Sequence, residues 1–268
     1  MAGFDKKKAL ETVAKGRRVN WWRREGSKSR GFQYLDAKGK RISRGDRFER
    51  ITGLVIPPAW KFVRINPAAG GKIQAVGVDE AGRLQYIYEP KYAERQARKK
   101  FAKIERFGEH LPKLKQLTNK HISLDGLPRD KVLAVVMRLI NSLYFRVGTD
   151  HSQENYKTFG ITTLQKRHLR IGRKGKLEFN FVGKSHVAQR KILVDEELAE
   201  IIKDLKGLGR GRKLFRYLDD EGKARAVTPG NINRYIKDAT DSEFSSKDFR
   251  TWGGTLLAAV ELAEIGPG

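Results

Sequence analysis

The chain has 268 residues, of which 39% are hydrophobic and 32% charged, and its formal net charge at pH 7 is +25. This amount of apolar material allows one large core or two smaller ones and excludes a wholly disordered chain. The chain contains no cysteine, which excludes disulfides, iron–sulfur clusters, thiolate zinc sites and cysteine nucleophiles.

Residues 1–90 are predicted to be rich in β-strands, because Gly, Pro and Asp interrupt short apolar runs at close intervals. Residues 31–42 form one expected hairpin, with its turn at 36–39. Residues 73–88 form another, with its turn at 79–82. In this second hairpin a period-two pattern indicates half-buried strands. The pattern consists of Ile73, Ala75 and Val78 before the turn and Leu84, Tyr86 and Tyr88 after it.

After Pro90 the spacing of apolar residues becomes helical, first over residues 91–122 and then over residues 130–145. In the second stretch apolar residues recur every three or four positions, as in a helix that packs into a bundle. These residues are Val132, Val135, Val136, Leu139, Ile140 and Leu143. The change of pattern places a domain boundary at residue 90, between an amino-terminal domain (1–90) and a second domain (91–268).

A short β interruption is predicted inside the helical part, at residues 161–194. Leu169 and Ile171 precede a turn at 172–175, and Leu177, Phe179 and Phe181 alternate after it, which indicates a hairpin that ends at Gly183 and Lys184. Helices resume at 195–209, which begins with acidic residues and ends with glycines, and at 228–240, where Thr228 before a proline is a reasonable cap. The predicted fold class is therefore α+β, with a small β-rich amino-terminal domain and a larger, mostly helical domain that carries an inserted hairpin.

The net charge indicates the kind of partner that the protein binds, because a strongly basic chain attracts polyanions. Nucleic acid is the expected partner, and a ribosome-like structural role or an anionic membrane surface are the alternatives. The amino terminus has no apolar core of a secretory signal, and no segment reaches the roughly 20 apolar residues of a membrane span. We therefore expect a cytoplasmic protein without a membrane segment.

Metal-assisted hydrolysis of DNA would need grouped histidines or carboxylates. The five histidines show no paired spacing on one helix face, and residues 219–222 are typical of a solvated turn. Residues 207–213 contain glycines but lack the Gly-Lys-Ser/Thr ending of a phosphate loop, so we interpret them as a basic surface loop. We expect neither a metal nor another cofactor.

Three cations follow predicted elements: Arg146, Lys184 and Arg250. Singly, each has an ordinary explanation as a solvent-facing, capping or Trp-stacked side chain. The apolar neighbours of Arg146, however, are expected to hold its guanidinium near the interior, where it needs an anion. In metal-free phosphoryl transfer two guanidiniums can grip the non-bridging oxygens, a lysine can protonate the leaving oxygen, and a tyrosine is the usual nucleophile.

The sequence resembles the poxvirus-like and bacterial type IB DNA topoisomerases over nearly its whole length. The similar segments stand in the family's order: VIPPAWKFVRINP, GRLQYIYEPKY, FRVGTDHSQENYKTFGITTLQKRHL, FNFVGK and SSKDFRTWGGT. The resemblance implies two domains that close around duplex DNA as a clamp. It also implies relaxation of supercoiled DNA by transient cleavage of one strand through a 3′-phosphotyrosyl intermediate, without ATP or metal.

The resemblance also implies roles for single residues. Arg146 and Arg250 match the arginines that stabilise the scissile phosphate, and Lys184 matches the general acid that protonates the 5′ leaving oxygen. Gln85 and Tyr86, with Arg83 of the same motif, match DNA contacts of the amino-terminal domain, although an ordinary strand pair is the alternative. Residues 148–157 resemble the loop beside the cleavage site, and Lys157 is its DNA-binding candidate.

The sequence departs from the family pattern after Arg250. In the family a His or Asn and then the tyrosine nucleophile follow the second arginine, but residues 251–268 contain no Tyr, His or Asn. All eight tyrosines precede Arg250. We therefore expect that the natural protein continues beyond Gly268 and that this chain binds duplex DNA without cleaving it. We also expect a monomer, associated with the nucleoid if its source is bacterial.

Two other functions remain possible on the sequence. A tyrosine recombinase shares the catalytic half and its chemistry, but the β-rich amino-terminal part with GRLQYIYEP argues against this class. An architectural nucleic-acid-binding protein is the second alternative, in which the cations only match phosphates.

Overall fold

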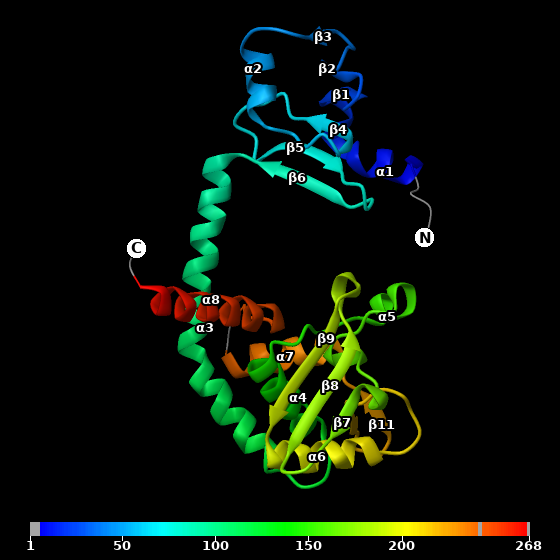
Figure 1. The fold of residues 1–268 in the computed structure, drawn as a ribbon, viewed down its shortest axis with the longest axis vertical. Coiled ribbons are helices and arrows are strands. Elements are labelled where there is room, and N and C mark those ends of the chain that lie inside the picture. Colours follow the sequence, from blue (N-terminus) through cyan, green and yellow to red (C-terminus); the bar gives the residue numbers. More distant parts are fainter. Residues whose placement is uncertain (1–5, 241–242, 267–268) are drawn as a thin grey trace. The chain divides into compact units, whose positions relative to one another are not determined.

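The computed structural model describes residues 6–240 and 243–266. The chain divides into two compact units, Met1–Lys100 (unit 1) and Phe101–Gly268 (unit 2). The division falls within one long helix, α3 (Pro90–Ile122), which begins at the predicted domain boundary (Figure 1). A β-rich unit and a mostly helical unit confirm the α+β class; the boundary at residue 90 itself stays a prediction.

Unit 1 contains a six-stranded antiparallel sheet with the order β3-β2-β1-β4-β5-β6. Its strands are β1 (Trp22–Ser27), β2 (Gly31–Leu35), β3 (Arg41–Ile42), β4 (Lys61–Ile65), β5 (Ile73–Val78) and β6 (Leu84–Tyr88). Both predicted hairpins are confirmed. The turn after β2 closes with a bond from the Asp36 N–H to the Lys40 carbonyl, and the turn after β5 closes from Asp79 to Arg83, both at 2.9 Å.

Helices cover both faces of this sheet (Figure 1). On one face Ile51 of α2 (Asp46–Gly53) packs among buried residues of the strands and loops. On the other face Val13, the last residue of α1 (Lys6–Val13), packs with Val76 and Val78 of β5. The prediction of a half-buried β5 is therefore wrong, because every residue from 74 to 78 is buried between the two layers.

Unit 2 is built on α4 (Arg129–Leu143), whose residues 132–140 are buried except for half-buried Arg138. The predicted apolar stripe thus extends almost around the helix. The elements that pack against it are helices α7 (Pro229–Thr240) and α8 (Ser246–Ile265) and strands β9 (Ala188–Val194) and β10 (Arg216–Leu218). Besides α4 and the second part of α3, the described α-helices of this unit are α5 (Asp150–Tyr156), α6 (Glu196–Gly207), α7 and α8. Each buried Leu or Ile of α4 stabilises the fold by about 1.5–3 kcal/mol.

The predicted β interruption is larger than a hairpin. Strands β7 (Leu169–Ile171) and β8 (Lys176–Val182) pair as expected, but β9 (Ala188–Val194) adds a third antiparallel strand along the whole of β8. The predicted hairpin does end at Gly183 and Lys184, directly after β8, but the prediction assigned no strand to the remaining residues of the interruption, where β9 lies. A separate hairpin of β10 (Arg216–Leu218) and β11 (Ala224–Ala226) turns at the predicted residues 219–222.

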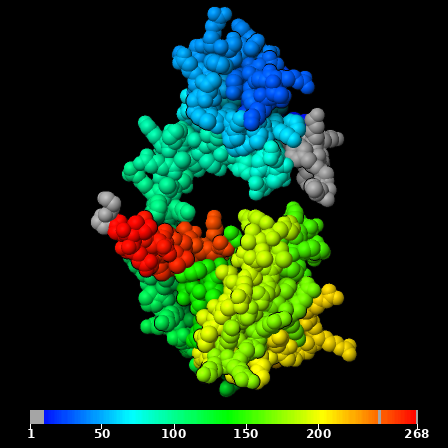
Figure 2. All heavy atoms as spheres, in the orientation of Figure 1, coloured from blue at the N-terminus to red at the C-terminus, as the bar shows by residue number. Residues whose placement is uncertain are grey.

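Helix α8 packs on the core only through its first half. Its buried residues end at Gly253, and a Cβ on Gly108 of α3 would overlap the ring of Trp252. Figure 2 shows the second half of α8, in red, at the surface of unit 2. Its exposed apolar side chains are Leu256, Leu257, Val260, Leu262 and Ile265. Within the described residues no helix has the length and apolar character that crossing a membrane requires.

Candidate functional site

The segment after α4 presents Arg146. Tyr144 ends the helix in a left-handed conformation (φ 52°), and its N–H donates to the Ile140 carbonyl at 2.9 Å. The Arg146 carbonyl accepts from the Ile161 N–H at 2.8 Å, which fixes the backbone. The expectation that the guanidinium lies near the interior is wrong: Phe145 is buried, but Arg146 is exposed, because successive residues of an extended segment point in opposite directions.

The turn between β8 and β9 presents Lys184. The Gly183 N–H donates to the Val187 carbonyl at 2.8 Å and closes the turn. Ser185 and His186 both have positive φ angles, 63° and 59°, which non-glycine residues adopt at a cost in free energy. Lys184 itself is exposed. A strained turn that holds an exposed lysine at a fixed place is typical of a functional position.

The second turn of α8 presents Arg250. The helix begins with a capping box, in which the Asp248 carboxylate accepts from the Ser245 N–H at 2.8 Å and from its hydroxyl at 3.0 Å. Lys103 of α3 donates to the same carboxylate at 3.0 Å. Phe249 is buried in the core, and Arg250 beside it is half-buried.

These three elements bring Arg146, Lys184 and Arg250 together in a pocket of about 410 Å³. Its described lining consists of Tyr144, Arg146, Phe159, Phe181, Gly183, Lys184, Ser185, Val187, Gln189, Lys191 and Arg250, and so includes cations but no carboxylate. Burial, and then the charge of Arg146, lowers the pKa of Arg250. The pocket therefore concentrates positive charge for an anion.

Lys191 also lines this pocket, and the sequence analysis did not select it. It lies on β9, where half-buried Gln189, Lys191 and Leu193 alternate with exposed residues. Burial, and then the charge of Arg250, lowers the pKa of Lys191. Inward and outward positions alternate along β9, as in any strand, but two of the three inward residues are polar. A search for alternating hydrophobic residues therefore does not find this strand.

Two of the three candidates for DNA contacts in unit 1, Arg83 and Gln85, donate hydrogen bonds to the same carboxylate oxygen. The side chains of Arg83 and Gln85 both donate to Asp79 Oδ2 at 2.9 Å. Hydrogen bonds, first from the Arg83 N–H and then from these side chains, lower the pKa of Asp79 to about 2. Tyr86, the residue after Gln85 in β6, points to the opposite face of the sheet and is exposed. Its ring stacks on that of Tyr88, with ring centroids 5.9 Å apart. The sheet thus presents two polar donors and an aromatic face.

Lys157 lies in unit 2, directly after α5, and is exposed. Residues 148–157 were expected as a loop, but most of them form this short helix, which Thr149 caps by accepting from the Ser152 N–H at 3.2 Å. Lys157 has a left-handed backbone (φ 51°) and does not line the pocket of Arg146.

The basic loop at 207–213 is at the surface, as predicted, with Arg210 and Arg212 exposed. Its backbone folds over two cations from elsewhere in unit 2. Lys166 donates to the Gly209 carbonyl at 3.0 Å, and buried Arg216 donates to the Leu208 carbonyl. These bonds fix the loop, so the exposed arginines are presented on an ordered backbone.

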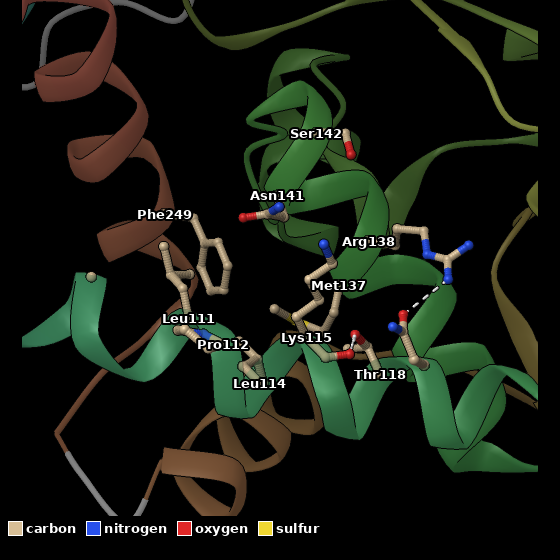
Figure 3. A pocket seen from close by; sticks show the side chains of 12 residues that line it. Leu111, Pro112, Leu114, Lys115, Thr118, Met137, Arg138, Asn141, Ser142 and Phe249 are labelled. Atoms are coloured by element: carbon tan, nitrogen blue, oxygen red, sulfur yellow. Dashed lines mark hydrogen bonds between the residues drawn. The ribbon is translucent and has the colours of Figure 1, made fainter.

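Another pocket of unit 2, about 760 Å³, lies between α3, α4 and α8. Figure 3 shows Leu111, Met137 and Phe249 around it, with polar groups such as Asn141 and Arg138 at its side. Arg138 is already paired with Glu197 at 2.6 Å. The described lining of this pocket has two cations, Arg138 and Lys115, among mostly apolar and uncharged polar residues, whereas four cations line the pocket of Arg146. Among the described residues, no group of three or more His, Cys, Asp or Glu could hold a metal ion.

A pocket lined by arginine and lysine side chains has the charge and the donors that suit a phosphate group. Comparison with known families identifies the class further. Residues 89–267 match "Eukaryotic DNA topoisomerase I, catalytic core", and residues 31–79 match "Bacterial DNA topoisomerase IB, N-terminal domain". The chain belongs to the type IB DNA topoisomerases, a family of DNA-binding enzymes, and the second match supports its bacterial branch.

Individual relatives agree with this family. DNA topoisomerase 1B of Acanthamoeba polyphaga mimivirus is 31% identical over 237 residues, which cover 87% of this chain and 70% of the viral protein. DNA topoisomerase 1 of Mycosarcoma maydis is 21% identical over 175 residues, 59% of this chain and 17% of that protein. A solved complex of the XerH recombinase with its difH substrate aligns at a TM-score of 0.38 and 14% identity, over 56% of this chain and 41% of XerH. That last likeness is too low to carry an argument.

Proposed function

We propose that the pocket of Arg146, Lys184 and Arg250 binds one phosphodiester of duplex DNA and supports its reversible transesterification. The two guanidiniums grip the non-bridging oxygens, on which negative charge grows in the transition state. The nucleophile is a tyrosine, which in the family follows the second arginine and which residues 251–268 lack. Its oxygen loses its proton to solvent and bonds to phosphorus as the bond to the 5′ oxygen breaks, and Lys184 gives that leaving oxygen its proton. Religation reverses each step, so supercoils relax without ATP or a metal.

The main support for this proposal is that cations from three distant parts of the chain line one pocket. The described lining contains no carboxylate to neutralise their charge. Bringing like charges together is unfavourable unless a ligand compensates it. Arg146 and Arg250 are close enough that the charge of the first lowers the pKa of the second. A single phosphodiester has the charge and the oxygen geometry to occupy such a place.

Unit 1 contributes to the same partner in this proposal. Arg83 and Gln85 exchange their bonds to Asp79 for DNA, and Tyr86 contacts the backbone or bases. Lys157 adds a contact in unit 2. The two domains, 1–90 and 91–268, act on one duplex as a clamp, in a monomer that works on the DNA of a bacterial nucleoid. The match of residues 31–79 to a bacterial topoisomerase domain supports this arrangement.

We propose that the tyrosines of this chain do not serve as the nucleophile. Tyr144 lines the pocket, but its ring is held against Gly253 of α8, where a Cβ would overlap it. The chain should therefore bind supercoiled plasmid without relaxing it. Relaxation by the purified chain would overturn this part, and loss of that relaxation in Tyr144→Phe would assign the nucleophile to Tyr144.

The binding part is tested with a fluorescent duplex, by measuring affinity as a function of salt. Arg250→Met and Lys184→Met should each weaken binding and reduce the slope of log affinity against log salt by about 0.9, the value for one lost phosphate contact. Arg225→Met is the matched control, because Arg225 is exposed and already paired with Asp219 at 2.7 Å. Equal small effects in all three variants would contradict a specific pocket.

A further inference from the structure

Lys191 is a fourth cation in the pocket, and the proposed chemistry gives it no role. It enters from β9, an element that carries neither arginine, and its side chain is half-buried. Three charged groups face it from the elements around it: Arg250 from α8, Arg146 from the segment after α4, and Lys184 from the turn before β9. No carboxylate of the described lining neutralises its charge.

The ammonium of Lys191 has a definite partner at the end of α4. Its Nζ donates to the carbonyl oxygen of Leu143, the last residue of the helix, at 2.7 Å. It also lies 5.7 Å from the centroid of the Phe145 ring. The last carbonyls of a helix have no partner within the helix and carry the negative end of its dipole, so a lysine there stabilises the terminus.

This contact bears directly on Arg146. The chain between Leu143 and Arg146 consists of left-handed Tyr144 and buried Phe145. Lys191 holds both sides of this short link, through the Leu143 carbonyl and the Phe145 ring. Beyond it, the Arg146 carbonyl is fixed by the Ile161 N–H at 2.8 Å. Arg146 is thus an exposed side chain on a backbone that is anchored on both sides.

The location of Lys191 has an electrostatic cost. Burial and the charge of Arg250 both lower the pKa of this lysine, so its charged form is disfavoured there. An apolar side chain would fill the same inward position of β9 without that cost. A lysine fits here because it supplies a donor to Leu143 that no apolar residue can supply.

We propose that Lys191 is a positioning residue, which holds the end of α4 so that Arg146 stays in the pocket with Arg250 and Lys184. The inference rests on the proposed function, in which Arg146 grips a DNA phosphate. It differs from a role as a further phosphate ligand, because Lys191 would then act on DNA independently of Arg146.

A double-mutant cycle on duplex affinity separates these roles. Lys191→Met removes the donor and keeps most of the stem, and we expect it to weaken binding roughly three- to tenfold, the scale of one ordinary hydrogen bond. In an Arg146→Ala background the same change should have almost no further effect. Lys191→Gln keeps a donor without the charge and should recover part of the loss. Arg190→Met, on the exposed face of β9, is the control for loss of one charge.

The outcomes are distinct. If Lys191→Met weakens binding as much in the Arg146→Ala background as in the original chain, Lys191 acts independently and the inference is overturned. The same holds if Lys191→Met behaves like Arg190→Met. If Arg146→Ala itself leaves affinity unchanged, the proposed function of the pocket fails, and this inference fails with it. Should Lys191→Met not fold, the cycle is completed with Lys191→Gln, for which the same non-additivity is expected.

Discussion

The ring of Tyr144 lies against Gly253, so closely that a Cβ at position 253 would overlap the ring. Tyr144 ends α4 shortly before Arg146, and Gly253 lies in α8 shortly after Arg250. The absence of a side chain at Gly253 therefore lets the two elements that carry the arginines approach each other. This contact is the direct structural link between the two sides of the pocket.

Gly253→Ala should destabilise unit 2, because the added methyl must displace the Tyr144 ring. Overpacking of this kind costs about 1–3 kcal/mol in the free energy of unfolding, which urea titration measures. The neighbouring glycine is the matched control. Gly254 has no atom within 4 Å of the added Cβ, so Gly254→Ala should stabilise the helix by about 0.5–1 kcal/mol. Equal changes in the free energy of unfolding for the two substitutions would show that the contact between Tyr144 and Gly253 does not contribute to stability.

Asp248→Ala should also reduce stability, by about 1–3 kcal/mol. The substitution removes the capping box of α8 and leaves Lys103 without the carboxylate that it contacts at 3.0 Å. Glu243→Ala is the comparison, because Glu243 pairs with Arg106 of the same α3 helix at an exposed site. Its effect should stay within about 0.5 kcal/mol. A larger loss for Glu243→Ala than for Asp248→Ala would be inconsistent with the cap.

His168 gives unit 2 a pH dependence. Its Nδ1 accepts from the Gln165 N–H at 3.1 Å, and its ring lies 4.4 Å from that of Phe159, a residue of the pocket. Burial, and then the charge of Arg167, lowers the pKa of His168 below its usual 6.5. The folded state thus binds the proton less readily than the unfolded state. The stabilisation is complete above pH 6.5 and decreases as pH falls through the lowered pKa.

The free energy of unfolding should therefore fall more steeply below pH 6.5 in the original chain than in His168→Gln. The difference between the two proteins at pH 8, where the imidazole is neutral in both states, gives the reference. Parallel curves between pH 8 and about pH 5 would contradict the shift.

Asp79 should titrate near pH 2, and NMR of its carboxyl carbon measures this directly. The stabilisation from its hydrogen bonds is complete above the unfolded value of 3.8 and is lost as pH falls through about 2. Arg83→Met removes one side-chain donor to this carboxylate and should move the midpoint upward toward 3.8. A midpoint near 3.8 in the original chain would mean that Arg83 and Gln85 are not held by Asp79.

Sequence patterns predicted those elements whose formation depends mainly on residues close together in the chain. The hairpin of β5 and β6 and the helix α4 follow from turn residues and from the spacing of apolar side chains. Strand β9 was missed because Gln189 and Lys191 occupy inward positions that a hydrophobic pattern expects to be apolar. These side chains face a polar pocket, which is a tertiary feature and leaves no periodic signal.

The site itself was only partly predictable. The positions of Arg146, Lys184 and Arg250 at the ends of elements could be seen, but their gathering depends on the packing of α4, β8 and α8. The exposure of Arg146 was predicted wrongly. Apolar residues on either side of a position are themselves expected to be buried, but they do not determine whether the residue between them is buried. Lys191 could be recognised only from its contact with Leu143, far away in the sequence.

A crystal structure of this chain with a short DNA duplex tests the central claim most directly. We predict one phosphodiester in the pocket, with a non-bridging oxygen within about 3 Å of each guanidinium, Arg146 and Arg250, and the Lys184 ammonium beside the 5′ oxygen. A duplex bound elsewhere on unit 2, with these three side chains turned away from every phosphate, would contradict the account.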